Sequence, residues 1–220
     1  MSIIDNFNLI KQNINSLKTD VVLKNDINIV VVTKTIPSDK FFPLININHC
    51  HFGENRVQEA KLKWQNIKKN YKNIKLHLLG KLQSNKVDDA YEIFDFIHSL
   101  DSKKLALKIF ENEKNFKKQI AIFIQINTGK EQQKAGIAIE DTKDFVDFCK
   151  EDLKLNVIGL MCIPPVSSEP TEHFLTLKDL ASKCNLAELS MGMSNDYIKA
   201  IKNGSTYVRI GSAIFGERTK

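Results

Sequence analysis

Apolar and polar positions follow two periods along this chain, and the order of those periods predicts its fold. Short aliphatic runs, typical of strands buried on both faces, are separated by longer segments with helical spacing. The predicted strands cover residues 28–35, 49–53, 75–80, 96–100, 120–127, 156–163, 188–192 and 207–211. The predicted helices cover residues 2–18, 38–47, 56–70, 84–93, 102–113, 141–150, 169–184 and 195–203.

Strands that alternate with helices in this way predict an α/β fold. Eight of them favour a single (β/α)8 barrel of the TIM type, with an extra helix before the first strand. A doubly wound open sheet is the alternative. No linker or shift in composition marks a boundary, so residues 1–220 are expected to form one domain. In a barrel, functional groups lie at the carboxyl ends of the strands, where this chain concentrates small and polar residues.

Composition excludes several classes of protein. Hydrophobic residues make up 42% and charged residues 26% of the chain, as in ordinary soluble domains. The net charge of +6 comes from lysines interleaved with acids, which favours a solvated surface over a nucleic-acid site. The four cysteines lack the spacing of a zinc site or a disulfide framework, and no apolar run is long enough to span a membrane. We therefore expect a cytosolic protein without a metal, a membrane span or a nucleic-acid partner.

Lys34 ends the first aliphatic run and is the first candidate for chemistry. A lysine shielded from water at the carboxyl end of a strand has a lowered pKa and can form a Schiff base with a carbonyl group. Taken alone, a lysine in this position more often ends a strand at the surface.

The loops after the seventh and eighth predicted strands have the composition of an anion site. Ser194 can cap a helix beginning at Asn195 while its hydroxyl and nearby amides face an anion, and Gly211-Ser212 allows close approach to the backbone. Tight turns without a ligand are the alternative. Arg209 alternates in phase with Tyr207, which places it in the lumen, where it could meet a cofactor or an internal acid.

These three features together describe a pocket for pyridoxal 5′-phosphate (PLP). The lysine would form the imine, the two loops would hold the phosphate, and the arginine would meet the pyridine nitrogen. An arginine there opposes protonation of the ring, which makes the ring a weaker electron sink than an aspartate partner would. The pocket therefore disfavours carbanion chemistry.

Six segments carry a resemblance to a known family. They read VVTKT at 31–35, FGENRVQE at 52–59, GKLQSNK at 80–86, IGLM at 158–161, LSMGMS at 189–194 and VRIGSAIFG at 208–216. In these segments and their order the sequence resembles the pyridoxal phosphate homeostasis proteins, the YggS/PROSC family, which share the fold of the amino-terminal barrel of alanine racemase. Two positions depart from the family pattern. Ser212 stands where threonine is frequent, and Asn48 replaces a glycine in an expected left-handed cap.

The resemblance implies a protein that binds PLP as a Schiff base, carries it and helps to control its free level, without established catalysis. The implied PLP-binding residues are Lys34 at the aldehyde, Asn55 in the pocket, Ser194, Gly211 and Ser212 at the phosphate, and Arg209 at the ring nitrogen. The implied recipients are PLP-dependent apo-enzymes. Lys86 and Lys134 match family positions and could receive or hand over PLP, although a solvated loop lysine is the default interpretation of each.

The residues also argue against racemase activity. Racemisation needs an acid or base on each face of the substrate carbon, and the four tyrosines fall in predicted helices or at a strand start. The chain ends shortly after the last strand, so we expect no second, β-rich domain of the kind that supplies a tyrosine to alanine racemase, and we expect a monomer. His49, His51, His77 and Cys162 are expected to serve packing. The alternatives are a low-activity PLP-dependent amino-acid racemase and a barrel for another phosphorylated metabolite.

Overall fold

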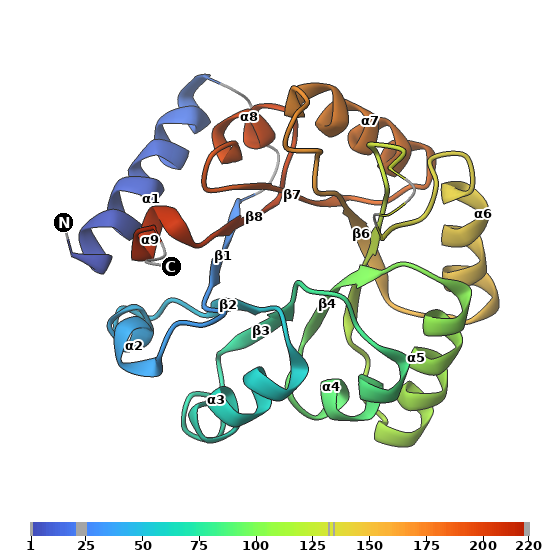
Figure 1. Cartoon of the computed structure of the whole chain (residues 1–220), viewed down its shortest axis with the longest axis horizontal. Coiled ribbons are helices and arrows are strands. Elements are labelled where there is room, and N and C mark those ends of the chain that lie inside the picture. Colours follow the sequence, from blue (N-terminus) through green and yellow to red (C-terminus); the bar gives the residue numbers. More distant parts are fainter. Residues whose placement is uncertain (1, 21–25, 132, 134, 218–220) are drawn as a thin grey trace.

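The computed structural model describes residues 2–20, 26–131, 133 and 135–217, and these residues form a closed barrel (Figure 1). Its parallel strands pair in chain order, and the last pairs with the first. The strands are β1 (Asn28–Val32), β2 (His51–Glu54), β3 (Lys75–Leu78), β4 (Phe96–Leu100), β5 (Ala121–Gln125), β6 (Val157–Met161), β7 (Glu188–Met193) and β8 (Tyr207–Ile210). The barrel prediction is confirmed, and the open-sheet alternative is wrong.

Helices surround the barrel as an outer ring (Figure 1). They are α1 (Ile3–Asp20), α2 (Ser38–Asn46), α3 (Val57–Asn70), α4 (Val87–Ile93), α5 (Lys103–Phe116), α6 (Thr142–Asp147), α7 (Pro170–Lys183), α8 (Tyr197–Lys202) and α9 (Ser212–Phe215), with a 3₁₀ turn η1 (Ser84–Lys86) and a π turn η2 (Phe148–Asp152). Within the described ranges, no helix combines the length and apolar content that a membrane span needs. The single-turn helix α9 was not predicted, because four residues are too short to show a helical period.

The extra helix α1 packs on the outside of the barrel beside the last helices. Its Asn6 Nδ2 donates to the Ile214 carbonyl of α9 over 2.9 Å, and its Asn13 Nδ2 donates to the Tyr197 hydroxyl of α8 over 3.2 Å. Figure 1 shows α1 lying beside α8 and α9. The amphipathic helix predicted at the start of the chain therefore packs on the barrel as expected.

Both faces of the strands are buried, as the unbroken aliphatic runs predict. In β1, Val30 packs inside the barrel with Phe123 and Tyr207, whereas Val31 packs outside against the helices. Strand β8 shows the same division, because Val208 belongs to the outer core while Tyr207 lies in the lumen. The predicted inward face of β8 is confirmed.

Strand β1 ends earlier than predicted. β1 ends at Val32, so Lys34 lies in a turn rather than in the strand. The chain turns because the Ile36 amide donates to the Thr33 carbonyl over 2.9 Å and Thr35 has a φ of 63°. A left-handed conformation was predicted at Asn48, and its φ of 62° confirms it.

Histidines and aromatic rings fill the amino-terminal half of the lumen. His77 stacks on Phe96 with ring centroids 4.1 Å apart, and His98 stacks on Phe123 at 4.3 Å. Both histidines are buried, which confirms a packing role for His77. Among the residues described, no group of His, Cys, Asp and Glu could hold a metal ion, and the cysteines are free.

These buried histidines predict a loss of stability in weak acid. Burial lowers the pKa of His77 and His98 well below the ordinary value, whereas in the unfolded chain both titrate near 6.5. Below about pH 6.5 the unfolded chain binds protons that the folded chain does not bind. The free energy of unfolding is therefore highest above this pH and falls as the pH drops below it. Each histidine contributes at most about 1.4 kcal/mol per pH unit. Urea unfolding at pH 7.5 and 5.5 measures this, and equal stability at the two values would contradict the prediction.

Candidate functional site

A cavity of about 860 Å³ opens at the carboxyl ends of the strands. The residues predicted from the sequence to bind PLP all line it, and they are Lys34, Asn55, Ser194, Arg209, Gly211 and Ser212. These residues come from the loops after β1, β2 and β7, from β8 and from the start of α9. Closure of the barrel, which pairs β8 with β1, brings the first loop and the last loops to one side of the molecule.

The turn that carries Lys34 is anchored on both sides by carboxylates. Before it, the buried Thr33 hydroxyl donates to Glu54 Oε1 over 2.7 Å. After it, the Thr35 amide donates to Glu59 Oε1 over 2.6 Å. Lys34 itself is half-buried. Because its two neighbours are fixed, its backbone has little freedom, and its side chain starts from a defined position at the cavity.

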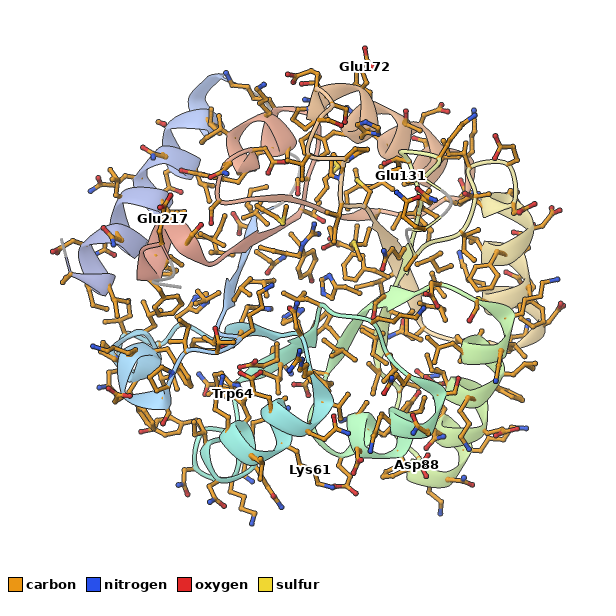
Figure 2. The ribbon with its side chains drawn as sticks, in the orientation of Figure 1. Lys61, Trp64, Asp88, Glu131, Glu172 and Glu217 are labelled. Atoms are coloured by element: carbon orange, nitrogen blue, oxygen red, sulfur yellow. The ribbon has the colours of Figure 1, made fainter. Side chains whose placement is uncertain are left out.

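Helix α3 supplies the charge that allows a carboxylate to be buried here. Lys63 Nζ donates to Glu54 Oε1 over 2.9 Å, to Glu59 Oε1 over 3.1 Å and to the Thr33 carbonyl over 2.8 Å. Trp64 Nε1 donates to the same Glu54 oxygen over 2.9 Å, and Figure 2 shows Trp64 between α3 and the barrel. Sequence analysis missed this cluster, although the four-residue spacing of Glu59 and Lys63 on a helix marks one pair of it.

The loop after β3 presses on the backbone of Asn55. A Cβ atom at Gly80 would lie 2.2 Å from the Asn55 carbonyl oxygen, so only glycine permits this approach. The Gly80 carbonyl in turn accepts a hydrogen bond from the Ser99 hydroxyl over 2.7 Å. The cavity wall at Asn55 is therefore supported by two neighbouring strands.

Ser194 lies at the cavity but does not cap a helix, so that part of the prediction is wrong. Helix α8 begins at Tyr197, and its N-cap is Asp196. The Ser194 hydroxyl instead accepts hydrogen bonds from the backbone amides of Gly211 and Ala213, at 3.3 and 3.2 Å. Local spacing could not reveal this contact, since it joins two loops that only the barrel brings together.

Arg209 is buried and held by neutral acceptors. Its Nη1 donates to the carbonyl and the hydroxyl of Ser190, both at 2.7 Å, and its Nη2 donates to the Cys162 carbonyl over 2.9 Å. Burial lowers the pKa of Arg209 and nearby Asp196 opposes that shift, yet a guanidinium remains protonated in proteins. The alternative of an internal salt bridge is not realised among the residues described, so the positive charge is left to act on the cavity.

The backbone of Cys162 serves the site, and its thiol does not. Burial raises the pKa of the thiol to about 12, so it stays protonated and unreactive at neutral pH. The packing role predicted for this cysteine agrees with its complete burial.

Comparison with known proteins places the chain in a family. Residues 6–219 match the family model of the alanine racemase N-terminal domain. A pyridoxal phosphate homeostasis protein of Aquifex aeolicus is 35% identical over 206 residues, which is 89% of each chain. Another, from Haemophilus influenzae, is 35% identical and covers 99% of this chain and 97% of its own. This chain belongs to the pyridoxal phosphate homeostasis protein family.

A solved structure of a relative extends the likeness to the fold. PipY of Synechococcus elongatus is 31% identical, and the match covers 93% of this chain and 99% of PipY. The TM-score is 0.83 for PipY without PLP and 0.80 for PipY with PLP bound. The resemblance carried by six short segments is thus confirmed, and so is the barrel predicted from the alternation of strands and helices.

Other residues considered in the sequence analysis do not line the cavity. Lys86 ends the turn η1 and does not belong to the lining, and the prediction for Lys134 falls outside the described residues. Tyr197 turns its hydroxyl to Asn13 of α1. Among the described residues, neither a tyrosine nor a histidine lines the cavity, which limits the acids and bases it offers.

Proposed function

We propose that this protein binds PLP in the cavity, carries it as a Schiff base on Lys34 and takes part in intracellular PLP homeostasis. The observation that carries the proposal is the convergence on one cavity of an amine, a guanidinium and the Ser194 hydroxyl, which two backbone amides hold in place. PLP presents an aldehyde, a pyridine nitrogen and a phosphate, one for each of these groups. The PLP-bound structure of PipY supports the choice of ligand.

The phosphate end of the cavity contains a glycine with open space in front of it. Gly211 has a φ of −124° and a ψ of −76°, a sparsely populated conformation for other residues, and a Cβ atom there would meet Val32 at an ordinary contact distance of 3.5 Å. A ligand lying against the backbone would explain why no side chain stands here. The amides of Gly211 and Ala213 donate to the Ser194 oxygen, which orients this hydroxyl at the cavity and leaves its own hydrogen to donate to a phosphate oxygen.

Arg209 fits the nitrogen end of a pyridine ring. Three N–H bonds of its guanidinium hold it to Ser190 and Cys162, and the group has five N–H donors in all. The donors that remain can meet an unprotonated ring nitrogen, which is an acceptor. When bound, PLP supplies an aldehyde that condenses with the Lys34 amine and releases water.

A carrier fits this lining better than a racemase does. Racemisation requires an acid or base on each side of a carbon atom, whereas the described lining has Lys34 and no tyrosine or histidine. Two of its other ionisable side chains are engaged, because Lys199 pairs with Glu169 and Asp196 accepts from the Met193 amide. A further carboxylate of the lining is that of Glu217. We propose further that the recipients are PLP-dependent apo-enzymes of the same compartment, the cytosol, and that the protein acts as a monomer.

Titration with PLP followed by borohydride reduction and peptide mass analysis tests the proposal. We expect one PLP adduct, located on Lys34. A Gly211→Ala variant should stay folded, losing at most about 1–3 kcal/mol of stability to backbone strain, but should bind PLP at least tenfold more weakly, because its methyl group meets the phosphate. Absence of PLP uptake by the natural protein would refute the proposal, and unchanged affinity in the Gly211→Ala variant would refute the phosphate site.

A further inference from the structure

A row of hydrogen-bonded side chains crosses the lumen and ends at Arg209. His51 Nδ1 lies 2.9 Å from His77 Nε2, and His77 Nδ1 lies 2.9 Å from His98 Nε2. His98 Nδ1 lies 2.8 Å from the Ser190 hydroxyl, which accepts from Arg209 Nη1 over 2.7 Å. We call these four residues, His51, His77, His98 and Ser190, the lumen chain. It links strands β2, β3, β4 and β7 to β8.

Arg209 fixes the donor-to-acceptor direction of the hydrogen bonds in the lumen chain. A guanidinium only donates, so the Ser190 oxygen must accept from it. The hydrogen of that hydroxyl then has one partner among the described residues, which is His98 Nδ1. A neutral His98 that accepts at Nδ1 carries its own hydrogen on Nε2.

The same direction continues through the other two rings. His98 Nε2–H donates to His77 Nδ1, so His77 also carries its hydrogen on Nε2 and donates to His51 Nδ1. Burial lowers the pKa of His77 and His98, which keeps both rings neutral as this pattern requires. Each buried nitrogen in the chain then has a partner, which removes the large cost of burying imidazoles.

The charge at the Arg209 end favours the same direction. Each ring turns an acceptor nitrogen toward this cation, and Arg209 adds to burial in lowering the pKa of His98. At the other end, burial and Lys75 lower the pKa of half-buried His51, and Asp95 opposes them. In this arrangement the free Nε2–H of His51 faces the solvent end of the chain.

We propose that Ser190, His98, His77 and His51 are positioning residues, which hold the Arg209 guanidinium in place for a ring nitrogen while adding no negative charge beside it. A carboxylate could also hold an arginine, but it would neutralise the charge that Arg209 presents to the cavity. The lumen chain is neutral, so it orients the group and leaves its charge intact. The role at the ring nitrogen rests on the proposed binding of PLP, whereas the direction of the chain does not.

Nuclear magnetic resonance of the imidazole nitrogens tests the direction without any ligand. In protein labelled with ¹⁵N-histidine, we expect His77 and His98 to be neutral and to carry hydrogen on Nε2. After Ser190→Ala, His98 Nδ1 loses its donor, and we expect its ¹⁵N resonance to move toward that of an unbonded nitrogen. Hydrogen on Nδ1 of His98, or a doubly protonated His98 at neutral pH, would overturn the proposed direction.

PLP affinity tests the positioning role. Ser190→Ala should weaken PLP binding about tenfold, because Arg209 keeps the Ser190 carbonyl and loses the hydroxyl. Phe123→Leu is the matched control, since Phe123 packs on His98 in the same lumen but belongs to no hydrogen bond of the chain. We expect this variant to lose stability and to keep its PLP affinity.

If Ser190→Ala and Phe123→Leu lost the same PLP affinity, the lumen chain would act only through packing, and the positioning role would be overturned. Unchanged affinity in Ser190→Ala would do the same. Failure of the natural protein to bind PLP would instead refute the proposed function, and the nitrogen spectra would still decide the direction of the chain.

Discussion

Replacement of Lys34 by alanine is expected to abolish the imine absorption band, at about 420 nm, that the proposed PLP adduct gives the natural protein. The reason is chemical rather than electrostatic. Only an amine condenses with the aldehyde, so loss of the Lys34 nitrogen removes the covalent bond whatever else the cavity retains. Spectra recorded during PLP titration of both proteins measure the effect.

Two control variants separate the covalent role from the charge. Lys34→Arg keeps a positive charge and should also lack the band. Lys199 is a second lysine of the cavity lining, but its amine is paired with Glu169 at 2.9 Å, so Lys199→Ala should keep the band. A band that survives in Lys34→Ala, or that disappears in Lys199→Ala, would show that the imine does not form on Lys34.

The second large effect is expected at Glu54, which lies beneath the Lys34 turn. Glu54→Leu removes the acceptor of the Thr33 hydroxyl, the Lys63 amine and the Trp64 ring N–H. Lys63 keeps its contacts with Glu59 and the Thr33 carbonyl, so the loss falls on the buried Thr33 hydroxyl and the Trp64 ring N–H. An unsatisfied buried donor costs about 1–3 kcal/mol, so the two together cost about 2–6 kcal/mol. The free energy of unfolding, measured in urea at an unchanged m-value, should fall by about that amount.

A matched variant distinguishes charge from shape. Glu54→Gln keeps an acceptor oxygen of similar position, so it should lose less stability than Glu54→Leu. An exposed ion pair on α7, between Asp179 and Lys183, gives the opposite case, and Asp179→Ala should leave the unfolding midpoint unchanged. A loss below about 1 kcal/mol in Glu54→Leu would show that the buried pair does not stabilise this turn.

The two effects are linked through the backbone. Thr33 and Thr35 flank Lys34, and both are bonded to the cluster of Glu54, Glu59 and Lys63. The backbone on both sides of Lys34 is therefore held by residues of β2 and α3. A stability measurement at Glu54 and a spectrum at Lys34 examine the same turn from its two sides.

The sequence predicted the strands and helices well because their signal is local. Four aliphatic residues from Ile29 to Val32 mark a strand buried on both faces, and the period of two at Tyr207 and Arg209 fixes which side chains enter the lumen. The positions at which strands and helices end were predicted less accurately. Lys34 lies in a turn beyond β1, since the Thr33 carbonyl bonds to Ile36 instead of continuing the sheet.

Long-range hydrogen bonds were beyond the reach of spacing. Serine is a common N-cap residue, but in this protein Asp196 is the N-cap of α8. The Ser194 hydroxyl instead accepts hydrogen bonds from the amides of Gly211 and Ala213. His98 gave no sequence signal beyond its inward phase in β4, and its partner Ser190 is 92 residues away. Such pairs are set by the closure of the barrel.

The sequence alone determined the order of the elements, the family and the identity of the six residues predicted to bind PLP, because these depend on local periodicity and short motifs. Only the tertiary structure decided that those residues line one cavity, that Glu54 and Lys63 anchor the turn of Lys34, and that Arg209 is held by a neutral chain instead of an acid. The physical reason is that each of these contacts joins strands or loops whose distance is fixed by barrel closure, which no local pattern records.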